Sequence, residues 1–136
     1  MRKNIFTLLI ALLLLSCSVD EGEETNYVLL PVESIQLPDE FVLNEEYEIP
    51  IVFKRPTNCH GYYDIFLKVD NEIRTLAVQC VVYENSDCEV LEENNQTNES
   101  FRFKILYDQV YVFRIWKGID ELGGEMYEEI EVPVVN

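Results

Sequence analysis

The stretch YEIPIVFK, residues 47–54, carries the pattern that decides the fold. Its apolar side chains fall on alternate positions, namely Tyr47, Ile49, Ile51 and Phe53. Because successive side chains of a β-strand point to opposite faces, this alternation predicts a strand with one buried face. Pro50 falls on the outward face, as does Pro133 in a later stretch of the same kind. Since proline has no backbone N–H, both positions favour an edge strand or a bulge.

The same alternation recurs along the chain and extends the prediction to a whole domain. The other stretches cover residues 28–37, 62–69, 73–84, 100–107, 110–117 and 127–135. Polar residues, prolines or glycines separate them, and no helical period follows residue 26. About seven short strands with regular turns are typical of an immunoglobulin-like sandwich. We therefore predict an all-β domain over residues 27–136, an immunoglobulin-like antiparallel β-sandwich of about seven strands.

One local motif resembles a known feature of such sandwiches. The stretch YDQVYVF, residues 107–113, resembles the tyrosine corner that leads into their sixth strand. The resemblance implies that the Tyr111 hydroxyl bonds to backbone just upstream. The match departs from the family at Val110, where glycine is usual, and at Phe113, where a buried cysteine is usual; an ordinary inward tyrosine stays the alternative. Trp116 has the opposite parity, which predicts a partly exposed ring and hints at a binding surface.

The cysteines beyond the N-terminal segment are Cys59, Cys80 and Cys88. An odd number in an exported chain leaves one that is unpaired or pairs elsewhere. Cys80 shares a predicted strand face with Leu76, where a free cysteine behaves as a small buried hydrophobe. Cys59 and Cys88 lie in polar turns, and an oxidising compartment favours a bridge between them. We predict the disulfide Cys59–Cys88, with Cys80–Cys88 as the competing pair.

The N-terminus has the order of an export signal. Arg2 and Lys3 precede an apolar run over residues 5–15, too short for the roughly 20 residues of a spanning helix. Residues 14–17, LLSC, resemble the lipobox of bacterial lipoproteins. The resemblance implies a signal peptide over 1–16, cleavage before Cys17, and acylation of Cys17 as a membrane anchor. A plain signal peptide with an incidental cysteine, or an uncleaved anchor, stays the alternative.

Residues 17–26 are polar and acidic, which predicts a solvated tether. The acidic run after the cysteine also resembles the export signal of surface lipoproteins in Bacteroidetes-type bacteria. That resemblance implies the outer membrane, with the domain on the cell surface. Val19 interrupts the acidic run, so the periplasmic face stays open.

The charge balance excludes one class of partner. The chain has 26 acidic and 10 basic residues, a net charge of −16. Loss of Arg2 and Lys3 with the signal peptide would bring the net charge to −18. Nucleic-acid binding needs a basic face that neutralises phosphates, and none is visible. We therefore predict no nucleic-acid partner, and a membrane link through the acyl anchor alone.

Catalytic and metal-binding patterns are weak. His60 is the only histidine, and no G-x-S-x-G motif occurs, so general acid–base or triad chemistry lacks its usual parts. Acidic residues gather at 87–93 and 120–125 without the spacing of an EF-hand loop. Calcium is the better metal candidate there, but such runs are usually solvated loops. We predict a protein that is not an enzyme, with no catalytic residues, no metal and no cofactor.

Two longer stretches, residues 37–61 and 111–134, give the chain a broader resemblance. The first runs from a proline turn through a strand to a cysteine turn, and the second ends in EVPV. Together they resemble small lipoproteins of Bacteroidetes-type bacteria, which implies fold and location but no activity. The leading hypothesis is a binding module whose sandwich loops recognise a protein, peptide or glycan. The alternative is a structural accessory subunit of an envelope complex, and a hydrolase acting through His60 is the weakest hypothesis.

Overall fold

The computed structural model describes residues 26–83 and 87–136, which form an all-β domain without a helix. No part of these two segments could therefore cross a membrane as an apolar helix. The signal peptide, Cys17 and nearly all of the tether lie outside the described residues. The strands are β1 (Asn26–Leu30), β2 (Val32–Ile35), β3 (Phe41–Val42), β4 (Glu46–Phe53), β5 (His60–Asp70), β6 (Ile73–Val82), β7 (Thr97–Lys104), β8 (Tyr111–Ile119), β9 (Glu125–Val132) and β10 (Val134–Val135).

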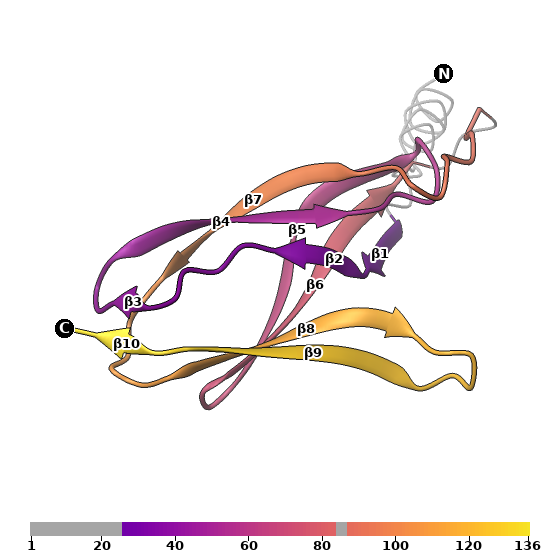
Figure 1. Ribbon diagram of the computed structural model, residues 1–136. Helices are drawn as coiled ribbons and strands as arrows, with labels where there is room; N and C mark the ends of the chain where they lie inside the picture. The colour runs from indigo at the N-terminus through magenta and orange to yellow at the C-terminus, as the bar shows by residue number, and fades with distance from the viewer. Residues whose placement is uncertain (1–25, 84–86) are drawn as a thin grey trace, which may run out of the picture.

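The strands form two main sheets and a short closing pair (Figure 1). The smaller sheet has the order β2–β4–β7. In the larger sheet, β6 pairs with β5 along its whole length. The other edge of β6 is shared, because β1 pairs with residues 78–82 and β8 with residues 73–76. β9 follows β8 as a long hairpin, and β10 pairs with β3.

The sheets are mixed, so the prediction of a wholly antiparallel sandwich is wrong. The pairs β6–β8 and β3–β10 are parallel. Between β6 and β8 the chain passes through β7, which belongs to the other sheet. A strand that returns to its sheet after such a crossing can run parallel to the strand it left, and β8 does so.

Residues 26–83 and 87–136 contain ten strands rather than the seven predicted, although every predicted stretch contains a strand. Pro31 divides the first stretch into β1 and β2, which join different sheets. Pro133 divides the last stretch into β9 and β10. The two-residue strand β3 had no alternation long enough to detect. The stretch at 100–107 is displaced, since β7 covers Thr97–Lys104 and Tyr107 is exposed.

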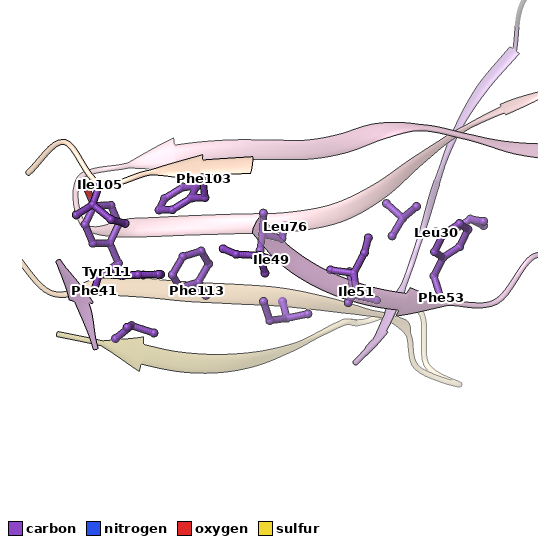
Figure 2. Packing of buried hydrophobic residues seen from close by; sticks show 14 of the residues in the cluster. Leu30, Phe41, Ile49, Ile51, Phe53, Leu76, Phe103, Ile105, Tyr111 and Phe113 are labelled. Carbon is purple, nitrogen blue, oxygen red and sulfur yellow. The ribbon is translucent and has the colours of Figure 1, made fainter. Parts of the chain in front are cut away.

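The core lies between the two sheets (Figure 2). Ile49, Ile51 and Phe53 of β4 are completely buried, as the alternation of residues 47–54 predicts. Leu76 and Phe113 face them from the larger sheet. Burying one such side chain contributes about 1.5–3 kcal/mol, so this alternating set stabilises the contact between the sheets.

Pro50 lies in the central strand of the smaller sheet, so the prediction of an edge strand there is wrong. β2 pairs with β4 only at the β4 residues Ile51 to Phe53. Beyond that ladder, the Pro50 carbonyl accepts a hydrogen bond of 3.0 Å from the Gln36 N–H. The N–H and C=O of a strand residue point to the same side of the strand. The N–H that Pro50 lacks would therefore point toward the segment after the end of β2, where no ladder bond requires it.

Tyr111 makes the hydrogen bonds that the tyrosine-corner resemblance implies. Its side chain is buried, and its hydroxyl accepts from the backbone N–H groups of Leu106 and Tyr107, each at 3.2 Å. The turn before β8 is thereby fastened to the core. A second partner is Arg74, whose guanidinium lies 5.0 Å from the centre of the Tyr111 ring. Arg74 is a buried charged residue on the inward face of β6, which the sequence analysis did not single out.

Candidate functional site

The predicted disulfide is present and joins two turns at one end of the domain. Cys59 and Cys88 are bonded, with their Cα atoms 5.5 Å apart. Hydrogen bonds surround the bridge, because the Asn58 N–H donates to the Glu89 carbonyl and the Glu89 N–H donates to the Asn58 side chain. The bridge and these bonds hold the segment from residue 87 onward against the turn that precedes β5.

Cys80 is the free cysteine of the described residues and is fully buried. Burial raises the pKa of its thiol to about 11. Because the thiolate is the reactive form, this thiol is chemically quiet at neutral pH. Its environment is that of the apolar core residue that the sequence predicts.

His60 takes part in the same turn as Cys59. Its Nδ1 lies 2.8 Å from the Thr57 hydroxyl, and its carbonyl accepts a hydrogen bond from Arg55. The Thr57 hydroxyl also accepts from the Cys59 N–H. These contacts order the turn. The imidazole therefore lies beside the Thr57 hydroxyl, which is itself hydrogen-bonded to the Cys59 backbone N–H.

The acidic clusters do not assemble a metal site among the described residues. Within residues 26–83 and 87–136, no three His, Cys, Asp or Glu side chains come together in a group able to hold a metal ion. Asp120 has a local role instead, since its carboxylate accepts from the N–H groups of Leu122 and Gly124. Its Oδ1 accepts both bonds and caps the turn between β8 and β9.

The strongest candidate for a binding site is a groove on the outer face of the larger sheet. We call it the Trp116 groove; its volume is about 200 Å³. Five strands contribute to it, because β1, β5, β6, β8 and β9 all supply side chains. Its lining residues are Leu29, Phe66, Lys68, Thr75, Ala77, Arg114, Trp116, Glu125 and Tyr127.

The groove arises from the sizes of side chains on neighbouring strands. Ala77 and Thr75 on the central strand β6 are small, and Phe66 lies opposite Ala77 on β5. On the other side, Trp116 of β8 lies opposite Tyr127 of β9. Large side chains on both sides of small ones leave a depression, and they cover Ala77 so well that it is only 3% exposed.

Charged groups line the rim of the groove. The Arg114 guanidinium lies 4.1 Å from the centre of the Tyr127 ring, a cation–π contact, and its Nε is 3.8 Å from Glu129. The Tyr127 hydroxyl donates to Glu125 at 2.7 Å. This hydrogen bond, more than partial burial, raises the pKa of Tyr127. The hydroxyl is therefore protonated at neutral pH and can donate to Glu125.

The indole of Trp116 has unused hydrogen-bonding capacity. Its Nε1 is shielded from solvent and has no acceptor among the described residues. A buried donor without a partner costs about 1–3 kcal/mol. An acceptor oxygen that met this N–H after a small rotation of the ring would recover that energy.

Exposed tyrosines extend the aromatic surface beyond the groove along the same face. The rings of Tyr27 and Tyr63 meet edge-to-face with centroids 4.9 Å apart. Tyr83 lies beside them and is 61% exposed. Partial burial, together with the Tyr63 phenol, raises the pKa of Tyr27. Aromatic residues gathered on one exposed face are typical of an interaction surface.

The sequence analysis identified one groove residue, Trp116, from its parity. It missed the other lining residues because each looks like an ordinary strand residue on its own. The signal that could have found Phe66 is a ring on the outward parity of a predicted strand. The expected position, the loops at one end of the sandwich, differs from the position of this groove on a sheet face.

Comparisons with known proteins give no relative from which to assign a function. No protein-family model matches the chain, and no curated protein or solved structure is significantly similar to it.

Proposed function

We propose that this chain is a non-enzymatic, lipid-anchored binding module of the bacterial cell envelope, displayed on the outer membrane. The Trp116 groove is the surface that meets the partner. The observation that carries the proposal is the gathering of Trp116, Phe66 and Tyr127 with Arg114 and Lys68 on one solvent-facing side of the larger sheet. Aromatic residues and arginine are enriched in protein interfaces, and they supply most of the energy where they cluster.

The size of the groove favours a macromolecular partner. Pockets that enclose a drug-sized ligand typically have volumes of about 300–1,000 Å³. The Trp116 groove, at about 200 Å³, is smaller. It would hold one side chain or one sugar ring of a partner that also covers the tyrosines beyond it. The partner is therefore a protein or a glycan, with no cofactor required.

The proposal places the fold among immunoglobulin-like sandwiches. Two observations support this placement: the hydrogen bonds of Tyr111 to upstream backbone, and the parallel closing pair formed by β3 and β10. The parallel pair β6–β8 is a departure from that architecture.

The anchor is tested by intact-mass spectrometry of protein purified from membranes. We expect a chain that begins at Cys17 and carries added acyl mass, because the lipobox resemblance implies both. Cys17→Ala should lose both the acyl mass and the start at residue 17. An unmodified chain that begins elsewhere would remove the anchor from the proposal.

The groove is tested by photo-crosslinking in cells. Benzoylphenylalanine in place of Tyr127 should form an adduct with the partner, whereas the same probe in place of Tyr107 should not. Tyr107 is a matched control, since it is an exposed tyrosine that does not line the groove. Adding Trp116→Ala to the Tyr127 probe should lower the adduct yield at least about tenfold, equivalent to roughly 1.4 kcal/mol.

The mass of the adduct identifies the class of partner. Equal adducts from both probes, or a yield that Trp116→Ala leaves unchanged, would show that the groove is not the binding surface. A single envelope protein recovered in fixed proportion would favour the alternative function, a structural accessory subunit.

A further inference from the structure

The strand β5 presents an open edge with apolar side chains. Within the described residues, β5 pairs with β6 alone, so the second edge of this 11-residue strand has no strand beside it. One backbone group of β5 has a local partner, since the Ile65 N–H donates to the Asp64 side chain at 2.7 Å. Tyr63, Phe66, Leu67 and Val69 on this strand are between 40% and 59% exposed. A long, exposed and apolar edge is a template for pairing with another strand.

Three other free edges of the two sheets, those of β9, β2 and β7, are protected. β9 carries Glu125, Glu128, Glu129 and Glu131, and it forms the opposite edge of the larger sheet. β2 has only four residues and an irregular register. β7 begins with the polar residues Thr97 and Asn98 and carries charges further along. Charge, short length and irregularity are the usual means of blocking an edge. β5 is the longest of these strands, and its bulge lies near its beginning, between Tyr62 and Asp64.

The sequence of β5 is complementary to itself in the antiparallel direction. A two-fold axis perpendicular to the sheet at Phe66 places Asp64 of each copy opposite Lys68 of the other. The pairing of β5 with β6 shows that Asp64 shares the outward face of Gln79 and that Lys68 shares the face of Thr75. Opposite charges on one face of directly opposed strands stabilise the pair, and they occur twice here.

The neighbouring registers lack this complementarity. An axis one residue later would place Asp64 opposite Asp70, and like charges opposite each other are destabilising. An axis one residue earlier would place Asp64 opposite Phe66, so the pairs between Asp64 and Lys68 would be lost. An axis between two residues would bring an outward side chain opposite an inward one, which the pleat forbids.

We propose that β5 is the contact between two copies of this chain, paired antiparallel about Phe66. The two larger sheets then form one continuous sheet across the contact. The Trp116 grooves lie on the same face of that sheet on either side of the axis, since Phe66 lines the groove of its own copy. A dimer of this kind would present two binding surfaces side by side.

The negative charge of the chain does not oppose this contact directly. The glutamates of β9 lie three strands away from β5, roughly 14 Å at the usual strand spacing. That distance exceeds the Debye length of about 8 Å at physiological ionic strength. At the contact itself, each Asp64 faces a Lys68, and Asp70 leaves each copy of β5 with one net negative charge.

Cysteine crosslinking of the full-length chain in cell membranes tests the register. Opposed Cα atoms in an antiparallel pair are about 4.5–5.5 Å apart, within disulfide range. Phe66→Cys should therefore give a covalent dimer under mild oxidation. Lys68→Cys should not, because two copies of that position lie roughly 13 Å apart in this register. The unsubstituted chain is the control for its native cysteines.

Charge reversal tests the contact by a second route, using sedimentation of the full-length protein in detergent. Lys68→Asp and Asp64→Lys should each weaken dimerisation roughly tenfold, because two attractive pairs become repulsive. The double variant should restore it. Lys54→Asp, an equal charge change on an exposed residue that follows β4 and does not contact β5, should have no effect.

A monomeric unsubstituted chain at all concentrations would overturn the proposal. So would equal crosslinking at positions 66 and 68, or a double variant no better than either single one. A Phe66→Cys chain that crosslinks to a different protein would show that the edge receives a foreign strand. None of these outcomes would affect the test of the Trp116 groove, which uses Tyr127 and Trp116.

Discussion

Phe41→Ala should lower the free energy of unfolding by about 3–5 kcal/mol, the range for removal of a fully buried aromatic ring. Phe41 is completely buried, although it belongs to a strand of two residues. Its ring lies within 6.0 Å of four others, centroid to centroid, at Tyr47, Phe103, Tyr111 and Phe113. Such ring pairs contribute about 0.5–1.5 kcal/mol each beyond the area they bury.

The position of Phe41 explains why the loss should be so large. Its backbone N–H donates to the Pro133 carbonyl at 2.8 Å, in the segment where β3 pairs with β10. The ring therefore joins the last strand of the chain to the aromatic part of the core (Figure 2). An alanine would leave a cavity that neighbouring rings, fixed by their own contacts, can only partly fill.

Urea denaturation followed by fluorescence measures this effect. Tyr107→Ala is the matched control, because it removes a ring that is already exposed, and surface changes usually alter stability by less than about 0.5 kcal/mol. A Phe41→Ala loss as small as the control loss would show that the five rings do not act as one packed group.

Removing the disulfide should have the second large effect. Cys59 and Cys88 are 29 residues apart in sequence. In the chain-entropy model, opening a loop of this length destabilises the folded state by between about 3 and 4 kcal/mol, because the unfolded chain gains freedom. The variant Cys59→Ser/Cys88→Ser should show that loss in the same denaturation experiment. Its unfolded state should also be more expanded, which raises the dependence of stability on urea concentration.

Reduction of the unsubstituted protein is the matched comparison. Since Cys80 is buried and unbridged, reduction opens only the Cys59–Cys88 bond among the described residues. Reduced protein and double variant should therefore agree within about 0.5 kcal/mol. If both are as stable as the oxidised protein, the hydrogen bonds between Asn58 and Glu89 would hold the two turns together without the bridge.

The sequence by itself determined the features that depend on local pattern. Alternation identified the inward faces of β4 and β8, because strand geometry assigns successive residues to opposite sides. The polar surroundings of Cys59 and Cys88, against the apolar strand around Cys80, separated the bridged pair from the buried thiol. Tyr111 was predictable because its partners, Leu106 and Tyr107, are near it in the chain.

Only the tertiary structure decided which strands are neighbours. Residue alternation states which side of a strand is buried but carries no information about the strand beside it. The passage of the chain through both sheets therefore made β6 and β8 parallel where an antiparallel arrangement was expected. For the same reason Arg74, a polar residue at an inward position, was unexpected until the Tyr111 ring was found beside it.

The Trp116 groove and the open edge of β5 also depend on which strands are neighbours, so the sequence alone did not reveal either of them. The groove depends on side chains from five strands, so the sequence could indicate Trp116 but not the residues around it. The charges of Asp64 and Lys68 are plain in the sequence, yet they form a pattern only when β5 is known to be an edge. Local order was fixed by covalent neighbours, whereas the sites were fixed by non-local hydrogen bonding between strands far apart in the chain.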